Sequence, residues 1–175
     1  MVDHKTILLV CHANTSRSII AEALLKKMLA DVALRQQFVV CSGGVAAYAR
    51  DGALVSMDAR LALRDDGVHL PPDAVSTDLK RNRHLVSNAD LILAMTNDQV
   101  RILTENFPEV EGKEVHTLRA FAGFEGDIED PVGQDESVYA ARRDEIKLCL
   151  RHTLARLAKR EGGGVRSMLP GRLPG

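Results

Sequence analysis

Four short segments with strand character, separated by stretches with helical spacing, constrain the fold of this chain more than any other feature. They lie at residues 6–10, 38–41, 91–95 and 114–118, and the first three are almost wholly apolar. A continuous apolar run is typical of a strand that is buried on both faces. Strands that alternate with helices form a parallel sheet joined by right-handed crossovers. We therefore predict an α/β fold of three layers, with helices on both faces of a parallel sheet.

The stretches between these strands carry the spacing and end signals of helices. The last helix is the clearest, because Asp135 and Glu136 lie in its first turn, Lys159 and Arg160 lie in its last, and Gly162 follows. Its apolar stripe consists of Ile146, Leu150, Leu154 and Leu157. Further helices are predicted over residues 19–30, 53–63 and 98–105, with another that ends at residues 85–89. Ligands of such a fold bind at the carboxyl ends of the strands.

Length and composition indicate one domain over residues 1–160. The chain has 175 residues, of which 45% are hydrophobic and 27% are charged, as in ordinary globular proteins. Residues 161–175 are dominated by glycine and proline. We predict that this tail is flexible and lies outside the fold.

Charge, hydropathy and cysteine usage argue against several classes of partner. The net charge is −1 and aromatic residues make up 3%, which is a poor match to a nucleic-acid surface. No apolar stretch reaches the thickness of a bilayer. The three cysteines, Cys11, Cys41 and Cys149, are odd in number and form neither a CxxC pair nor a zinc-ligand pattern. We predict a cytoplasmic protein with no nucleic-acid or membrane partner, no metal and no cofactor.

The loop between the first strand and the first helix is the main candidate site. It begins at Cys11 and runs to Arg17 and Ser18. A loop that enters a helix N-terminus directs backbone N–H groups and positive potential at one point, where a phosphate can bind. The same field stabilises a thiolate, so we expect Cys11 to be nucleophilic at neutral pH. The predicted phosphate-binding residues are His12, Ala13, Asn14, Thr15, Ser16, Arg17 and Ser18.

Individual roles follow from side-chain chemistry. Arg17 can bind two phosphate oxygens through its planar fork. Ser18 can donate its hydroxyl to the sulfur, and Asn14 suits a left-handed backbone position. The alternative interpretation is structural: Cys11 is a buried residue at a strand end, Arg17 is solvated, and a serine caps the helix. No GxxxxGK[ST] motif is present, so nucleotide hydrolysis of that kind is not supported.

A general acid is expected in the loop before the last helix. Asp130 precedes Pro131, whose fixed φ restrains the preceding residue to an extended conformation. Asp127 and Glu129 are rivals in the same loop, and an acidic turn without catalytic function is the plain alternative.

Cys11-x5-Arg17-Ser18 after the first strand and Asp130-Pro131 before the last helix together resemble the low-molecular-weight protein-tyrosine phosphatase family, over about residues 5–160. The resemblance implies a four-stranded parallel sheet. It also implies Cys11 as nucleophile, Arg17 as phosphate binder and Asp130 as general acid and later base, with Asn14, Ser18 and Ser42 bracing the loop. The implied substrate is a phosphorylated protein, the product is inorganic phosphate, and the reaction passes through a phosphocysteine.

The sequence departs from the family pattern in four places. Ala13 stands where glycine is usual, and Ser16 replaces a second cysteine, so a protective disulfide within the loop is not expected. Val132 follows Asp-Pro where an aromatic residue is common, which weakens the wall expected for a phenyl ring. Residues 69–86 are longer than expected, and no bracing histidine is assigned to them.

The type of phosphorylated residue depends on Thr15. The tyrosine-specific branch usually carries a bulky aliphatic residue there, whereas a branch resembling protein-arginine phosphatases carries threonine, which leaves space and a hydrogen-bonding group for a guanidinium. Phosphotyrosine and phosphoarginine both remain open. Two rivals remain: an arsenate reductase of the same fold, which needs two further cysteines close together, and a phosphate-binding module without catalysis.

Overall fold

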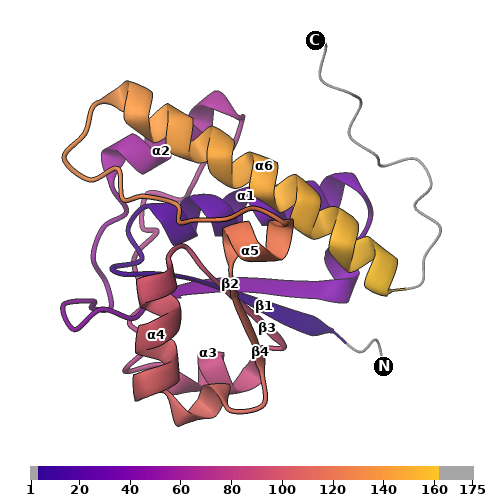
Figure 1. The fold of residues 1–175 in the computed structure, drawn as a ribbon. Coiled ribbons are helices and arrows are strands. Elements are labelled where there is room, and N and C mark those ends of the chain that lie inside the picture. The colour runs from indigo at the N-terminus through magenta and orange to yellow at the C-terminus, as the bar shows by residue number, and fades with distance from the viewer. Residues whose placement is uncertain (1–3, 162–175) are drawn as a thin grey trace.

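The computed structural model describes residues 4–161, which form a four-stranded parallel sheet between two layers of helices (Figure 1). The strands are β1 (Lys5–Cys11), β2 (Phe38–Gly44), β3 (Leu91–Ala94) and β4 (Glu114–Thr117), in the order β2-β1-β3-β4. All three neighbouring pairs are parallel. The three-layer fold predicted from the alternation of strands and helices is confirmed.

The sheet register places the candidate site at one edge of the molecule. Cys11, the last residue of β1, is level with Gly44 at the end of β2, and Val10 is level with Ala94 at the end of β3. The carboxyl ends of these strands therefore open onto a common edge, where the loop after β1 begins.

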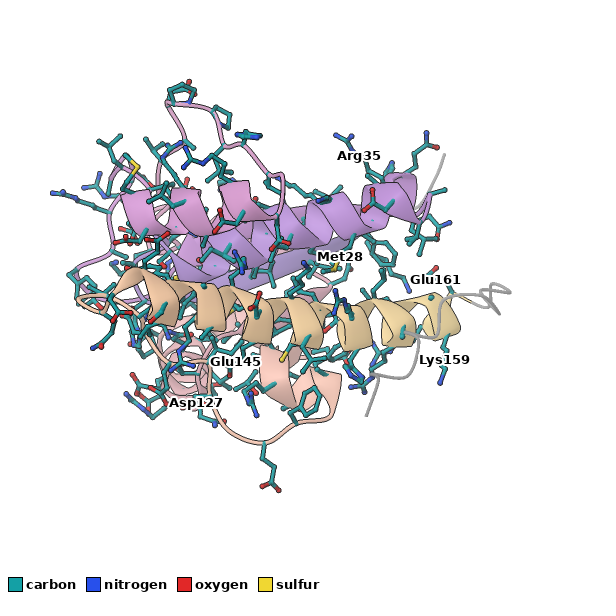
Figure 2. The ribbon with its side chains drawn as sticks, turned by 90° about the horizontal axis from the view of Figure 1, so that it is seen from above. Met28, Arg35, Asp127, Glu145, Lys159 and Glu161 are labelled. Carbon is teal, nitrogen blue, oxygen red and sulfur yellow. The ribbon has the colours of Figure 1, made fainter. Side chains whose placement is uncertain are left out.

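Helices cover the two faces of the sheet unequally. One face carries α1 (Arg17–Asp31), α2 (Met57–Asp65), α5 (Leu118–Ala122) and α6 (Glu136–Arg160), and the other carries α3 (Arg83–Asn88) and α4 (Asn97–Asn106) (Figure 1). Seen from above, α6 crosses its face with α1 and α2 on one side and α5 on the other (Figure 2). Two 3₁₀ turns, Arg35–Gln37 and Pro108–Val110, complete the described elements.

Side chains of β1 alternate between two hydrophobic cores. Ile7, Leu9 and Cys11 belong to the larger core, which packs against α1 and α6. Leu8 and Val10 belong to the smaller core with Leu103 and Phe107 from α4 and its end. Each fully buried aliphatic side chain contributes about 1.5–3 kcal/mol relative to exposure. The central strand, and with it the position of Cys11, is therefore fixed from both sides.

Helix starts follow local capping chemistry. The side chains of Ser56, Thr96, Thr117 and Asp135 each accept a backbone N–H of the helix that follows, which satisfies a donor that has no partner within the helix. Among residues 4–161, no helix is both long and apolar enough to cross a membrane.

Three predicted boundaries were wrong. The second strand does not stop at residue 41 but continues to Gly44, because Gly43 and Gly44 keep extended pairing with β1. The helix predicted over residues 53–63 begins only at Met57, since Ser56 caps it. Leu118 begins the short helix α5 rather than ending β4. The predicted tail lies, apart from Glu161, outside the described residues.

Candidate active site

The loop from β1 to α1 forms a compact cradle at the edge of the sheet. Cys11 ends β1 with 3% of its surface exposed, and Arg17 begins α1, also 3% exposed. Ser16 occupies the N-cap position but its side chain makes no cap bond, so the first N–H groups of α1 are not taken up by it. Those groups and the helix dipole are available to an anion.

The sulfur of Cys11 points into this cradle. The backbone N–H of Asn14 donates to the Sγ atom at 3.1 Å, and the hydroxyl oxygen of Ser18 lies 2.9 Å from it. Asn14 has φ 60°, the left-handed conformation expected from its side chain. The alternative in which Cys11 is merely a buried strand end does not account for a sulfur that receives an N–H group of the loop.

A chain of polar side chains braces the cradle. The amide nitrogen of Asn14 donates to Ser18 Oγ at 2.7 Å and to Ser42 Oγ at 2.9 Å, and Ser42 donates in turn to Glu22 at 3.0 Å. The remaining polar atom of Asn14, its Oδ1, accepts the backbone N–H of Thr77 at 2.9 Å. The structure thus brings Asn14, Ser18 and Ser42 together, as the family resemblance implied.

Sequence reasoning missed Glu22 and Thr77. Glu22 lies one turn after Ser18 on α1, so its position on the loop side of the helix could have been inferred. Thr77 could not, because it acts through its backbone and lies in the stretch 69–86 that did not match the family pattern. It supplies the brace for which no histidine was assigned.

Arg17 is held on the side of the loop that precedes α6. Its Nη1 atom donates to the carbonyl oxygen of Ile128 at 2.8 Å, and its Nη2 atom lies 3.5 Å from Asp130 Oδ2. The other Asp130 oxygen accepts the N–H of Val132 at 3.0 Å, across Pro131, which fixes the carboxylate in a tight turn. The Asp130 side chain is 48% exposed, so it faces both the cradle and solvent.

The rival acid Asp127 has a different role in the structure. Its Oδ1 atom accepts the backbone N–H and the side-chain amide of Asn97, both at 2.9 Å, and so ties this loop to the start of α4. Figure 2 labels Asp127 at the edge of the molecule. The geometry therefore favours Asp130 over Asp127 as the acid beside Arg17.

His12 is bonded on both sides of its ring rather than solvated. Its Nδ1 atom lies 2.9 Å from the side-chain nitrogen of Gln99 and 3.4 Å from Arg17 Nη2, and its Nε2 atom lies 3.2 Å from Asp98. Asp98 and Gln99 were not predicted site residues. The pattern Thr96-x-x-Gln99 at the start of a helix was the available signal, because it is a capping box.

A pocket of about 310 Å³ opens beside the cradle. Its lining residues are Ala13, Thr15, Tyr48, Ala49, Arg50 and Ala53. Thr15 presents a short polar side chain to this space, and Tyr48, 69% exposed, stands at its rim. Val132, 61% exposed, is the residue where the family pattern led us to expect an aromatic wall. The part of a substrate beyond the phosphorus atom has room here.

Of the other two cysteines, Cys149 is buried and Cys41 is partly buried. Burial raises the pKa of Cys41 to about 11, and burial likewise raises the pKa of Cys149 to about 11. Both are therefore protonated near neutral pH, and neither forms a disulfide in the described chain. Within residues 4–161, no three His, Cys, Asp or Glu side chains gather as metal ligands.

Comparison with known proteins agrees with this geometry. A family model described as "Low molecular weight phosphotyrosine protein phosphatase" matches residues 6–162. A protein-arginine-phosphatase from Geobacillus stearothermophilus is 36% identical over 143 residues, which cover 81% of this chain and 88% of the relative. An "Arsenate reductase 1" from Bacillus cereus is 31% identical over 83% of this chain and 91% of its own.

Solved structures place the fold in the same group. The YwlE arginine phosphatase from Geobacillus stearothermophilus superimposes with a TM-score of 0.79 at 33% identity, covering 90% of this chain and 95% of that one. A Cys-to-Ser variant of YwlE with a phosphorylated active-site serine gives a TM-score of 0.78 at 32% identity, covering 94% and 99%. With the family match over nearly its whole length, the chain belongs to the low molecular weight phosphotyrosine protein phosphatase family.

Proposed function

We propose that residues 1–160 form a phosphatase domain that hydrolyses phosphorylated protein residues through a phosphocysteine at Cys11. One observation carries the proposal: the Cys11 sulfur receives the Asn14 N–H in a loop whose Arg17 lies 3.5 Å from the Asp130 carboxylate. Nucleophile, anion-binding groups and acid therefore converge on one space.

The first chemical step transfers the phosphoryl group to sulfur. The Cys11 thiolate attacks phosphorus, and the bond from phosphorus to the leaving oxygen or nitrogen breaks as Asp130 gives that atom a proton. The N–H groups of the loop and Arg17 carry the charge that develops on the phosphoryl oxygens. In the second step Asp130 takes a proton from water, water attacks phosphorus, and the sulfur leaves as a thiolate with inorganic phosphate as the other product.

The substrate that best fits the pocket is phosphoarginine. Thr15 supplies a short hydroxyl side chain in the pocket wall, which suits a polar guanidinium better than a phenyl ring. Val132 stands where the family pattern commonly has an aromatic residue, so that position offers no aromatic face to a phenyl ring. The relatives named as arginine phosphatases support the same preference, and the phosphorylated serine in the YwlE variant supports a covalent intermediate.

Arsenate reduction is the rival within the fold, and a relative bears that name. It requires a cysteine pair near the nucleophile to carry a disulfide. Cys41 is level with Leu8 on β2 and packs with the smaller core, whereas Cys11 belongs to the larger core, and Cys149 is buried in α6. This arrangement favours hydrolysis. A free thiolate also requires reducing surroundings, so we place the protein in the cytoplasm.

Side-by-side turnover of phosphoarginine and phosphotyrosine peptides tests the proposal, with Cys11→Ser as the inactive reference. Thr15→Ile should lower kcat/KM for phosphoarginine by about 10-fold or more, because it removes the hydroxyl and also adds one carbon to the side chain, a change in size that alone alters binding by about 1–3 kcal/mol. Phosphotyrosine turnover should be retained or rise.

Thr15→Val is the matched control, since it keeps the size of threonine and removes only the hydroxyl. If kcat/KM for phosphoarginine falls in both the Val and the Ile variant, the hydroxyl of Thr15 is the group that recognises the substrate. If it falls in the Ile variant alone, the space left by the short side chain is what matters. Turnover of both peptides by Cys11→Ser at the wild-type rate, or thioredoxin-coupled arsenate turnover by the wild type, contradicts the proposed function.

A further inference from the structure

The orientation of the Gln99 side chain is fixed by the backbone that leads into α4. Gln99 is fully buried, and its Oε1 atom accepts the N–H of Met95 at 2.9 Å and the N–H of Thr96 at 3.0 Å. In return, the Thr96 side chain accepts the backbone N–H of Gln99, so the two residues form a capping box. Because both N–H groups must meet an oxygen, the side-chain nitrogen of Gln99 is the atom directed at His12.

This orientation determines where His12 carries its proton. The Nε2 atom of Gln99 can only donate hydrogen bonds. His12 Nδ1, 2.9 Å away, therefore accepts a hydrogen bond from it and carries no proton. The proton is then on His12 Nε2, which donates to Asp98 Oδ2 at 3.2 Å. Hydrogen bonds from Arg101, and then from His12, hold the pKa of Asp98 below its usual value, so it remains an acceptor.

The unprotonated nitrogen of His12 faces the phosphate-binding arginine. Arg17 Nη2 lies 3.4 Å from His12 Nδ1 and 3.5 Å from Asp130 Oδ2, while Nη1 donates to the Ile128 carbonyl. The guanidinium is thus surrounded by three acceptors from two segments, the loop after β1 and the loop before α6. A proton on His12 Nδ1 would replace one of them by a cation.

We propose that Gln99 is a positioning residue that acts through His12, keeping the His12 ring in its neutral Nε2–H form so that Nδ1 holds Arg17 in place while charge develops on the phosphoryl oxygens. The inference rests on the proposed function for its kinetic consequence only. During catalysis Asp130 turns to the leaving group and exchanges its proton, so its hold on Arg17 is interrupted. His12 and Ile128 then keep the guanidinium in place.

The charged groups around His12 come from three elements. Asp98 and Arg101 belong to α4, Arg17 belongs to α1, and Asp130 lies in the loop before α6. The ring therefore lies between an acidic side chain on its Nε2 edge and a cation on its Nδ1 edge. The Nδ1 edge faces two donors, the side-chain nitrogen of Gln99 and Arg17 Nη2.

Gln99→Glu tests the inference because it keeps the hydrogen bonds of the helix cap and replaces the donor that faces His12 Nδ1 by an acceptor. One carboxylate oxygen can still accept the N–H groups of Met95 and Thr96. The other oxygen would face the His12 Nδ1 lone pair, so His12 takes up a proton there from solvent. Nitrogen NMR of His12 should show one bare and one protonated ring nitrogen in the wild type and two protonated nitrogens in the variant.

The exposed Gln36 in the 3₁₀ turn after α1 supplies the matched control, because Gln36→Glu makes the same chemical change far from the loop. Gln36→Glu should leave the His12 signals and kcat unchanged. Gln99→Glu should lower kcat about 10-fold, with KM changed by less than about twofold, since one hydrogen bond to a charged group is lost. A wild-type spectrum with the proton on Nδ1 overturns the inference.

Two substitutions of His12 provide a second test if Gln99→Glu does not fold. His12→Asn places an amide oxygen where Nδ1 lay, whereas His12→Leu places no acceptor there. The Leu variant should lose about 10-fold in kcat and the Asn variant clearly less. Equal kcat in the two variants contradicts the role of His12. If the wild type hydrolyses neither peptide, the proposed function fails, while the NMR result still decides the His12 tautomer.

Discussion

Ser18 Oγ lies 2.9 Å from the sulfur of Cys11. The amide nitrogen of Asn14 donates to the same oxygen at 2.7 Å, so the hydroxyl hydrogen of Ser18 is not used in that contact. The Ser18 hydrogen is then free to point at sulfur. In the proposed mechanism, a hydrogen bond from Ser18 stabilises the Cys11 thiolate both as attacking group and as leaving group.

Ser18→Ala should therefore slow the reaction while the protein keeps its fold. A hydrogen bond to a charged group contributes about 1.5–3 kcal/mol, so we expect kcat to fall about 10- to 100-fold. The hydrolysis of the phosphocysteine should suffer most, because sulfur leaves in that step. Rapid-mixing kinetics with an aryl phosphate should show a larger initial burst. The exposed Ser87→Ala is the control, and an unchanged kcat in Ser18→Ala would contradict the role.

Asp130→Asn should distinguish substrates by their leaving groups. Without a proton donor, peptides with poor leaving groups should lose about 10²- to 10⁴-fold in kcat, whereas an activated aryl phosphate should lose less. Glu129→Gln is the matched control, since that neighbour is exposed. A uniform loss with every leaving group would show that Asp130 only positions Arg17.

Alkylation should modify Cys11 before Cys41, although Cys11 is the less exposed of the two. Exposure alone favours Cys41, which is partly exposed, whereas Cys11 is buried. Burial raises the pKa of Cys41 to about 11, so its thiolate fraction at neutral pH is on the order of 10⁻⁴. Iodoacetamide at neutral pH followed by peptide mass spectrometry should label Cys11 first, and inorganic phosphate should protect it. Faster labelling of Cys41 would contradict the stabilised thiolate.

Gly44→Ala should displace the backbone of the loop that forms the cradle. A Cβ atom at Gly44 would lie 2.6 Å from the backbone oxygen of His12 and 2.8 Å from the backbone carbon of Ala13. The loop must move away, so phosphate affinity should fall and the free energy of unfolding should drop by about 1–3 kcal/mol. Val40→Ala, on the same strand but within the core, should lower stability without changing phosphate affinity. Calorimetric titration with phosphate and urea unfolding separate the two effects.

An ion pair between α6 and β4 predicts an acid-sensitive part of the stability. Hydrogen bonds from Arg160 lower the pKa of Glu114 from 4.5 to about 2. Because the folded pKa is the lower one, this stabilisation is present above about pH 4.5 and is lost as pH falls towards about 2. In Glu114→Gln the melting temperature should depend less on pH over that interval, and near neutral pH it should be lower than in the wild type. An equal slope in both proteins would contradict the assignment.

Most of the fold could be predicted from the sequence because buried parallel strands leave a strong apolar signal. Residues 91–95 are almost identical to β3, and the charges at both ends of α6 marked its limits closely. Boundaries failed where local and tertiary preferences compete. Glycine usually ends a strand, yet Gly44 continues β2 because only a residue without a side chain fits beneath the loop.

The candidate site was predictable in its loop and less so in its surroundings. Local sequence patterns were enough to identify Cys11, Arg17 and Asp130. These patterns mark the end of a strand, the start of a helix and a turn at proline, respectively. Gln99 and Thr77 reach the loop from segments distant in sequence, and a single sequence holds no record of such contacts. His12 was predicted only as one of the phosphate-binding loop residues, because its partners Gln99 and Asp98 could not be known.

The Thr77 amide that holds Asn14 has a consequence for how this protein can change. A main-chain donor survives every replacement at its own position except proline, so drift in the side chain at residue 77 leaves the nucleophile's loop intact. Insertions and deletions are different, because they alter the route of the chain. In the segment before Arg83, a change of length therefore threatens this hydrogen bond more than a change of side chain does.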